Sequence, residues 1–94
     1  MEQIIEGKKY STKTGSLVAS DRYWDGNNHD RRGRNTYLYK TPNGRFFVHH
    51  TTRWQGERDY IEAISESEAR GYYEQLPEYE MGYAEAFGEE PEEA

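Results

Sequence analysis

The sequence predicts an α+β fold: a small antiparallel sheet with a central β-hairpin at about residues 35–52, followed by one or two C-terminal helices. Two observations lead to this class. β-rich runs fill the first two thirds of the chain, and helical spacing of apolar residues follows them. Strands that precede helices, rather than alternating with them, are typical of α+β proteins. A chain of 94 residues makes one domain, which we place at residues 1–88, with an acidic tail at 89–94.

The N-terminal region is expected to hold three short strands. Residues 2–5 and 8–11 have strand composition on either side of a glycine turn. The segment STKTGS is expected to form a second turn, because Ser and Thr hydroxyls bind nearby backbone groups. The third strand runs through Leu17 and Val18 and extends at most to Trp24.

The clearest expected element is a hairpin in the segment NTYLYKTPNGRFFVHHTTRW. Its centre favours a turn, because proline presets φ and the Asn-Gly pair that follows tolerates positive φ. Two β-rich runs around such a turn predict antiparallel strands. Side chains alternate between the two faces of a strand. The face that we expect in the core carries Leu38, Phe46 and Val48.

The opposite face of this hairpin is unusually aromatic for a surface exposed to water. It carries Tyr37, Tyr39, Phe47 and His49. We expect this face to be covered either by the C-terminal helices or by a binding partner.

A last strand and a helix are expected after the hairpin. The strand lies in YIEAI, with Ile61 or Ile64 pointing inward. Ser65 and Glu68 match a capping box, in which each side chain accepts from the backbone N–H of the other residue, so a helix should begin there. Its apolar stripe, at helical spacing, is Ala69, Tyr72, Tyr73 and Leu76.

A second helix is expected from Pro77 onward. Proline either ends the first helix or occupies the first position of the next one. Tyr79, Tyr83 and Phe87 follow at four-residue spacing, and Gly88 can end the helix.

The sign of the charge changes along the chain. Residues 1–20 have a net charge of +1, residues 21–58 of +4 and residues 59–94 of −11, which together make the overall −6. Such asymmetry indicates an electrostatic partner. Nine of the fourteen aromatic residues are tyrosines, a residue type enriched at binding hot spots.

The sequence carries no motif of an enzyme. It has no Gly-rich phosphate loop, no Gly-x-Ser-x-Gly elbow and no His-Glu metal helix. The chain has no cysteine, so disulfides and thiolate metal sites are excluded. His49 and His50 are neighbours on an expected strand and should face opposite sides of the sheet, so they cannot share one ion. We therefore expect no catalytic residues, no metal and no cofactor.

Nothing in the sequence indicates a membrane protein. No apolar run approaches the roughly 20 residues of a membrane span, and the first ten residues lack the apolar core of a signal peptide. We expect a protein of the cytoplasm, in a bacterial host cell.

Two surfaces are candidates for binding a partner. The first is the acidic surface of the expected helices, in which tyrosines lie among carboxylates; it could equally be a solvated helix face. Its candidate residues are Glu66, Glu74, Glu78, Glu80, Glu85, Tyr79 and Tyr83.

The second surface combines the basic loop DGNNHDRRGRN with the aromatic face of the hairpin, where guanidinium groups could hold phosphates and rings could stack on bases. Its candidate residues are Arg31, Arg32, Arg34, Tyr37, Tyr39 and Phe47.

The segments GKKYSTKTGSLVAS, TYLYKTPNGRFFVHH and AISESEARGYYEQL, with a closing AFG, resemble small acidic proteins of phages, plasmids and integrative elements. This group includes anti-CRISPR inhibitors, which are compact, often acidic and tyrosine-rich proteins that bind Cas proteins. The resemblance implies a non-enzymatic inhibitor that binds a Cas effector and blocks its nucleic-acid-binding surface.

Two other functions stay open from the sequence. One is a small nucleic-acid-binding accessory protein that uses the arginine loop and the aromatic hairpin face. The other is a structural module that self-associates through its tyrosines.

Overall fold

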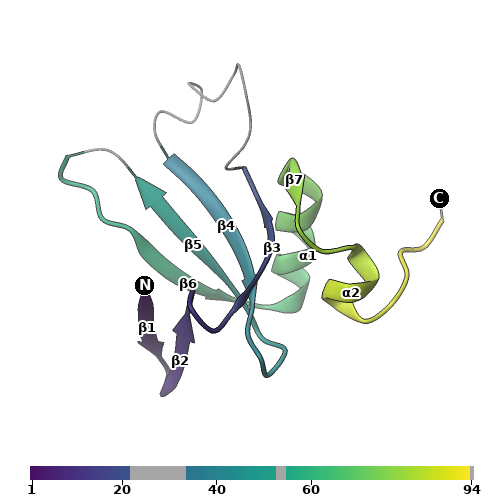
Figure 1. The fold of residues 1–94 in the computed structure, drawn as a ribbon, viewed down its shortest axis with the longest axis horizontal. Helices are drawn as coiled ribbons and strands as arrows, with labels where there is room; N and C mark the ends of the chain where they lie inside the picture. The colour runs from purple at the N-terminus through teal and green to yellow at the C-terminus, as the bar shows by residue number, and fades with distance from the viewer. Residues whose placement is uncertain (22–33, 53–54, 94) are drawn as a thin grey trace.

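The computed structural model describes residues 1–21, 34–52 and 55–93. These residues form strands and two helices in an α+β arrangement, as the sequence predicts (Figure 1). The elements are β1 (Glu2–Ile5), β2 (Lys8–Ser11), β3 (Ser16–Ser20), β4 (Arg34–Lys40), β5 (Phe46–Thr52), β6 (Tyr60–Ile64), α1 (Glu66–Gln75), β7 (Glu78–Tyr79) and α2 (Tyr83–Phe87).

The described strands make two sheets. A five-stranded sheet has the order β6-β5-β4-β3-β7, and β1 pairs with β2 in a separate two-stranded sheet. All neighbouring strands are antiparallel. The predicted strand through Val18 is β3, while its extension toward Trp24 lies outside the described residues.

The predicted central hairpin is β4–β5. In its register Leu38 lies opposite Val48, and Tyr39 lies opposite Phe47. The turn between the strands is closed by two backbone hydrogen bonds, from the Thr41 N–H to the Arg45 carbonyl (2.7 Å) and from the Gly44 N–H to the Thr41 carbonyl (2.9 Å).

One face of the large sheet packs against the two helices. Leu38, Phe46 and Val48 are buried there, as predicted. Their partners from the helices include Leu76 and Phe87, and the Phe87 ring stacks on Phe46 with 5.2 Å between centroids. The apolar cluster on this face is the larger of the two that the described residues form.

The β1–β2 hairpin covers the part of the other face around Phe47. Phe47 is fully buried: Tyr39 stacks on it (5.0 Å between centroids) and Tyr10 of β2 meets it edge-on (5.7 Å). The expectation that helices or a partner cover this face was therefore wrong for Phe47, because an N-terminal hairpin already excludes water from it. Gly15 fits the same layer, since a Cβ there would approach the Phe47 ring to 3.2 Å.

The first helix begins as the sequence predicts. The Ser65 side chain accepts from the Glu68 N–H (3.1 Å), and the Glu68 carboxylate accepts from the Ser65 N–H (3.1 Å). Ile61 and Ile64 both point inward, but to opposite faces of the sheet: Ile61 packs with Phe47, and Ile64 packs on the helix side.

The prediction of one continuous helix after Pro77 was wrong. Residues Glu78–Tyr79 form the edge strand β7, which pairs with β3, and α2 is only five residues long. The four-residue spacing of Tyr79, Tyr83 and Phe87 imitates a helix, but pairing with β3 holds Tyr79 extended. The predicted end of the helix at Gly88 is confirmed, and the Gly88 backbone lies in the left-handed region with φ 79°.

The burial of Phe47 predicts the effect of truncating it. We expect Phe47→Ala to lower the free energy of unfolding by about 3–5 kcal/mol, because it leaves a cavity between two apolar layers. The control Ile4→Ala, at a side chain that is 63 % exposed, should cost less than about 0.5 kcal/mol. Urea unfolding measures both. If both variants lose an equally small amount of unfolding free energy, Phe47 is not buried as described.

Candidate macromolecular interface

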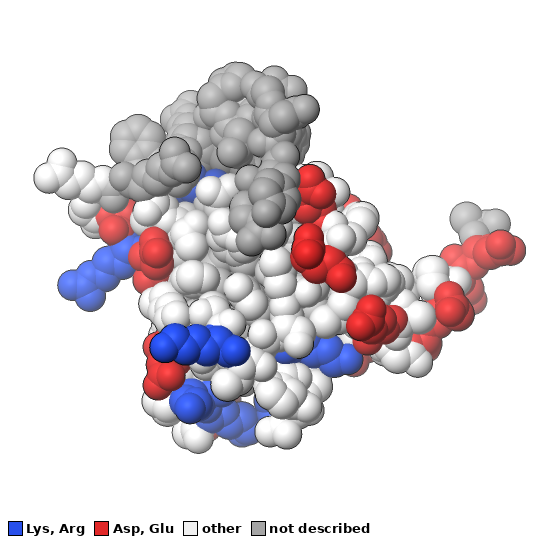
Figure 2. All heavy atoms as spheres, in the orientation of Figure 1, with Lys and Arg blue, Asp and Glu red and all other residues white. Residues whose placement is uncertain are grey.

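Opposite charges gather at different ends of the molecule. Figure 2 shows acidic side chains over the part that carries β7, α2 and the C-terminal tail, while lysines and arginines gather toward β2 and the β4–β5 turn. We call the first part the acidic end; it comprises the side chains of Glu74, Glu78, Glu80, Glu85, Glu89, Glu90, Glu92 and Glu93.

Arg70 is the one basic residue in the sequence from 59 to 94, and it is already engaged. Its guanidinium binds the Glu66 carboxylate (2.5 Å) and the Glu89 carboxylate (2.7 Å), and it donates to the Tyr83 hydroxyl (2.9 Å). These two carboxylates raise the pKa of Arg70. The residue therefore joins α1 to α2 and to the tail, and it neutralises little of the remaining acid.

Most carboxylates of the acidic end form no ion pair with a cation in the described part of the chain. Among the described residues, no ion pair reaches Glu74, Glu78, Glu80 or Glu85. All of these are exposed except Glu78, which is partly buried. The predicted acidic surface is thus present, but strand β7 and the short α2 carry much of it, where two helices were expected.

Tyr79 is the exposed aromatic residue of this end. It is 50 % exposed, and one face of its ring stacks on Tyr73 with 4.4 Å between centroids. Tyr73 is itself fixed, because its hydroxyl donates to the Met81 carbonyl (2.9 Å). Tyr83, the other predicted tyrosine of this surface, is partly buried and bonded to Arg70. Tyr79 is therefore the better anchor for a partner.

The predicted basic surface is brought together only in part. Arg31 and Arg32 lie outside the described residues. Arg34 begins β4, and its guanidinium binds both carboxylate oxygens of Glu57. The Glu57 carboxylate also accepts from the Thr52 hydroxyl (2.6 Å). Arg34 is thus held by an internal partner, which weakens the expectation that it binds phosphate.

The aromatic residues of the predicted basic surface differ in how deeply their side chains are buried. Phe47 is a core residue, which removes it from any partner-binding set. Tyr37 and Tyr39 are partly exposed and line an open hollow of about 250 Å³ together with His49. Burial lowers the pKa of His49.

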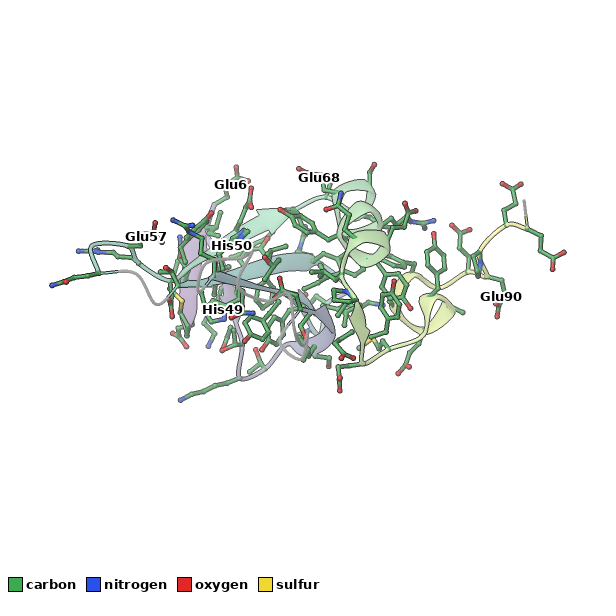
Figure 3. All side chains as sticks on the ribbon, turned by 90° about the horizontal axis from the view of Figure 1, so that it is seen from above. Glu6, His49, His50, Glu57, Glu68 and Glu90 are labelled. Carbon is green, nitrogen blue, oxygen red and sulfur yellow. The ribbon has the colours of Figure 1, made fainter. Side chains whose placement is uncertain are left out.

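A polar cavity of about 420 Å³ lies at the Arg34 end of the central hairpin. His50 borders it, stacked on Tyr60 with 4.5 Å between centroids and 3.0 Å from the Glu62 carboxylate through Nε2. A histidine next to a carboxylate can move protons, but this pair lies on the strand surface with Glu62 exposed. Figure 3 shows His49 and His50 on opposite faces of the sheet, as the strand alternation predicts.

Sequence reasoning missed a basic cleft. The cleft has a volume of about 470 Å³, and its lining includes Lys8 and Lys9 of β2 and Arg45, which follows the β4–β5 turn. The residues are 36 positions apart in the chain, so no local motif reveals them. The Lys-Lys pair in GKKY was the one available signal.

Two further findings concern metals and membranes. Among residues 1–21, 34–52 and 55–93, no group of three or more His, Asp or Glu side chains is placed to hold a metal ion. Neither described helix has the length and apolar character needed to cross a membrane.

Comparison with known proteins gives no relative: no family model, curated protein or solved structure matches the chain.

The Arg34–Glu57 pair predicts how Glu57 titrates. Its carboxyl pKa should lie below the ordinary value for glutamate, because Arg34 and the Thr52 hydroxyl donate to the ionised form. The stabilisation from this pair is present above the ordinary glutamate pKa and is lost as the pH falls through the lowered value. Carbon-13 NMR of the glutamate carboxyls measures the pKa of Glu57. Arg34→Gln should raise the Glu57 pKa, whereas the matched Arg58→Gln should leave it low; the same pKa in both variants would contradict the pairing.

Proposed function

We propose that this protein is a non-enzymatic inhibitor made by a mobile genetic element, and that it binds a Cas effector and blocks its nucleic-acid-binding surface. The observation that carries the proposal is the acidic end, where carboxylates that form no ion pair with a described cation flank an exposed tyrosine. The partner class comes from the resemblance to small acidic phage and plasmid proteins.

Carboxylates grouped in this way can take the place of a nucleic-acid backbone. A groove that binds nucleic acid is lined by Lys and Arg, and it gains affinity by releasing the counterions of the polyanion. Glu74, Glu80 and Glu85 present negative charge that no described lysine or arginine neutralises. They can therefore bind such a groove without first breaking an ion pair with any lysine or arginine that the structure describes.

Tyr79 adds an anchor that charge alone does not provide. Tyrosine is a frequent hot-spot residue because its ring buries a large area and its hydroxyl keeps a polar contact. Stacking on Tyr73 holds the ring in place before binding, which reduces the entropy lost when a partner covers it. The acidic end thus combines electrostatic attraction with one rigid apolar contact.

The proposal predicts protection of a targeted plasmid in cells. Bacteria that carry CRISPR systems of several types are transformed with a plasmid that each system targets, with and without expression of this protein. Transformation should rise in at least one system, and the purified effector of that system should lose binding to its target DNA in a mobility-shift assay. Unchanged interference in every system would contradict the choice of partner.

Charge reversal at the acidic end tests the surface itself. We expect Glu80→Lys with Glu85→Lys to weaken effector binding by about ten-fold or more, because like charges then face the basic groove. The matched control Glu2→Lys with Glu6→Lys changes the net charge equally but lies in and beside β1, and it should keep binding. Biolayer interferometry at two salt concentrations measures both, with the native affinity falling as salt rises. Equal loss in both pairs would mean that net charge acts, not this surface.

A further inference from the structure

The basic cleft lies away from the acidic end and has a chemistry of its own. Lys8, Lys9 and Arg45 line it together with Thr14, Thr41 and Asn43. Because neighbours on a strand face opposite sides, Lys8 shares the face of Tyr10, which is turned toward the sheet, and Lys9 shares the opposite face with Ile4. None of the described residues that line the cleft is acidic. In a protein of net charge −6, a concave site lined by Lys8 and Arg45 and by no described acid is suited to an anion.

The size of the cleft indicates a ligand larger than one small ion. Its volume of about 470 Å³ falls within the range of roughly 300–1,000 Å³ that is typical of ligand sites. Arginine can bind a phosphate through two parallel N–H donors, while lysine acts as a point charge. The basic side chains of the cleft therefore fit neighbouring phosphates along a polyanion.

The backbone on both sides of the cleft is held in place. On one side Tyr10, next to the lysines, is buried against Phe47. On the other side the Arg45 N–H donates to the Thr41 hydroxyl (3.0 Å), and the Arg45 carbonyl accepts from the Thr41 N–H (2.7 Å). A site whose backbone is fixed loses little entropy when it binds.

A second observation indicates which anion fits. Lys8, Lys9 and Tyr10 line the cleft, and Thr12, just beyond β2, lines the aromatic hollow. At about 3.3 Å per residue, the two hollows are about 7–13 Å apart along this segment. The hollow offers the partly exposed ring of Tyr37 beside the imidazole of His49, with 6.1 Å between centroids. Aromatic side chains beside a cationic track are the usual means of holding single-stranded nucleic acid.

We propose that the cleft at Lys8 and Arg45 binds the phosphate backbone of a single-stranded nucleic acid, whose bases stack in the Tyr37 hollow further along the same segment. An acidic peptide would match the cations but would not use the rings. This second site goes beyond the inhibitor function, because it lies on β2 and the β4–β5 turn and not on the acidic end.

Fluorescence anisotropy with a labelled twelve-residue oligothymidine at low salt tests the site. The native protein should bind it, and Lys8→Gln with Arg45→Gln should weaken binding by about ten-fold while reducing the slope of log K against log salt by about 1.4, at about 0.7 per phosphate contact. The control Arg58→Gln with Gln55→Glu removes the same net charge at the β5–β6 connection and should keep the native affinity and slope.

The role of the hollow is tested separately. Tyr37→Ala should weaken oligothymidine binding by at least about five-fold, because one stacking ring is lost, whereas Tyr37→Phe should retain it. An abasic oligonucleotide of the same length should bind the native protein more weakly than oligothymidine and should not respond to Tyr37→Ala.

Three results would overturn the proposal. They are no oligothymidine binding by the native protein at low salt, equal loss in the cleft variant and its control, or equal affinity for oligothymidine and a polyglutamate peptide. Circular dichroism of each variant shows that it is folded. If oligothymidine binding is lost but plasmid protection is intact, the proposed inhibitor function still stands. If plasmid protection is lost but oligothymidine binding is intact, the nucleic-acid site still stands.

Discussion

The structure depends on the burial of one hairpin, β4–β5, from both sides. Leu38 and Val48 face the helices, while Phe47 faces the N-terminal hairpin, and all three are fully buried. The chain has few aliphatic residues, so rings supply much of the buried area, at roughly 150–250 Å² for each one buried. Because both faces of this hairpin are covered, the two charged regions are attached to opposite layers: the acidic end to the helix layer, and the basic cleft to the N-terminal hairpin.

The distribution of internal cations then decides which charges remain available. Arg70 is used to join α1, α2 and the tail, and Arg34 is used to hold Glu57. Lys40 donates to the Ala86 carbonyl (2.8 Å) and so fixes α2 on β4. The acidic end is left with carboxylates that have no described cation, whereas Lys8, Lys9 and Arg45 line a cleft without acids. Such separation increases the field that each end presents to a macromolecule.

Local chemistry in the sequence predicted the elements that local chemistry controls. The turn after Lys40 and the capping box at Ser65 are both specified by neighbouring residues, and both were found. Tyr79 was misassigned because its helical spacing competes with pairing to β3, which is a tertiary contact. The cover over Phe47 and the basic cleft also join distant segments, so single-sequence patterns could not reveal them. The tyrosines and glutamates of the candidate surface stay a predicted partner-binding set. Glu74 lies on the predicted first helix, whereas Glu78 and Tyr79 lie in β7 and not on a helix.

The account rests on two apolar layers packed against opposite faces of one hairpin, and ring-to-ring nuclear Overhauser effects test this most directly. The structure predicts cross-peaks between Tyr10 and Phe47 in one layer and between Phe46 and Phe87 in the other. It also predicts that Phe47→Ala removes the first contact and leaves the second. Tyr10 with shifts of an unstructured chain and no cross-peak to Phe47 would contradict the two-layer core, and with it the separation of the charged ends.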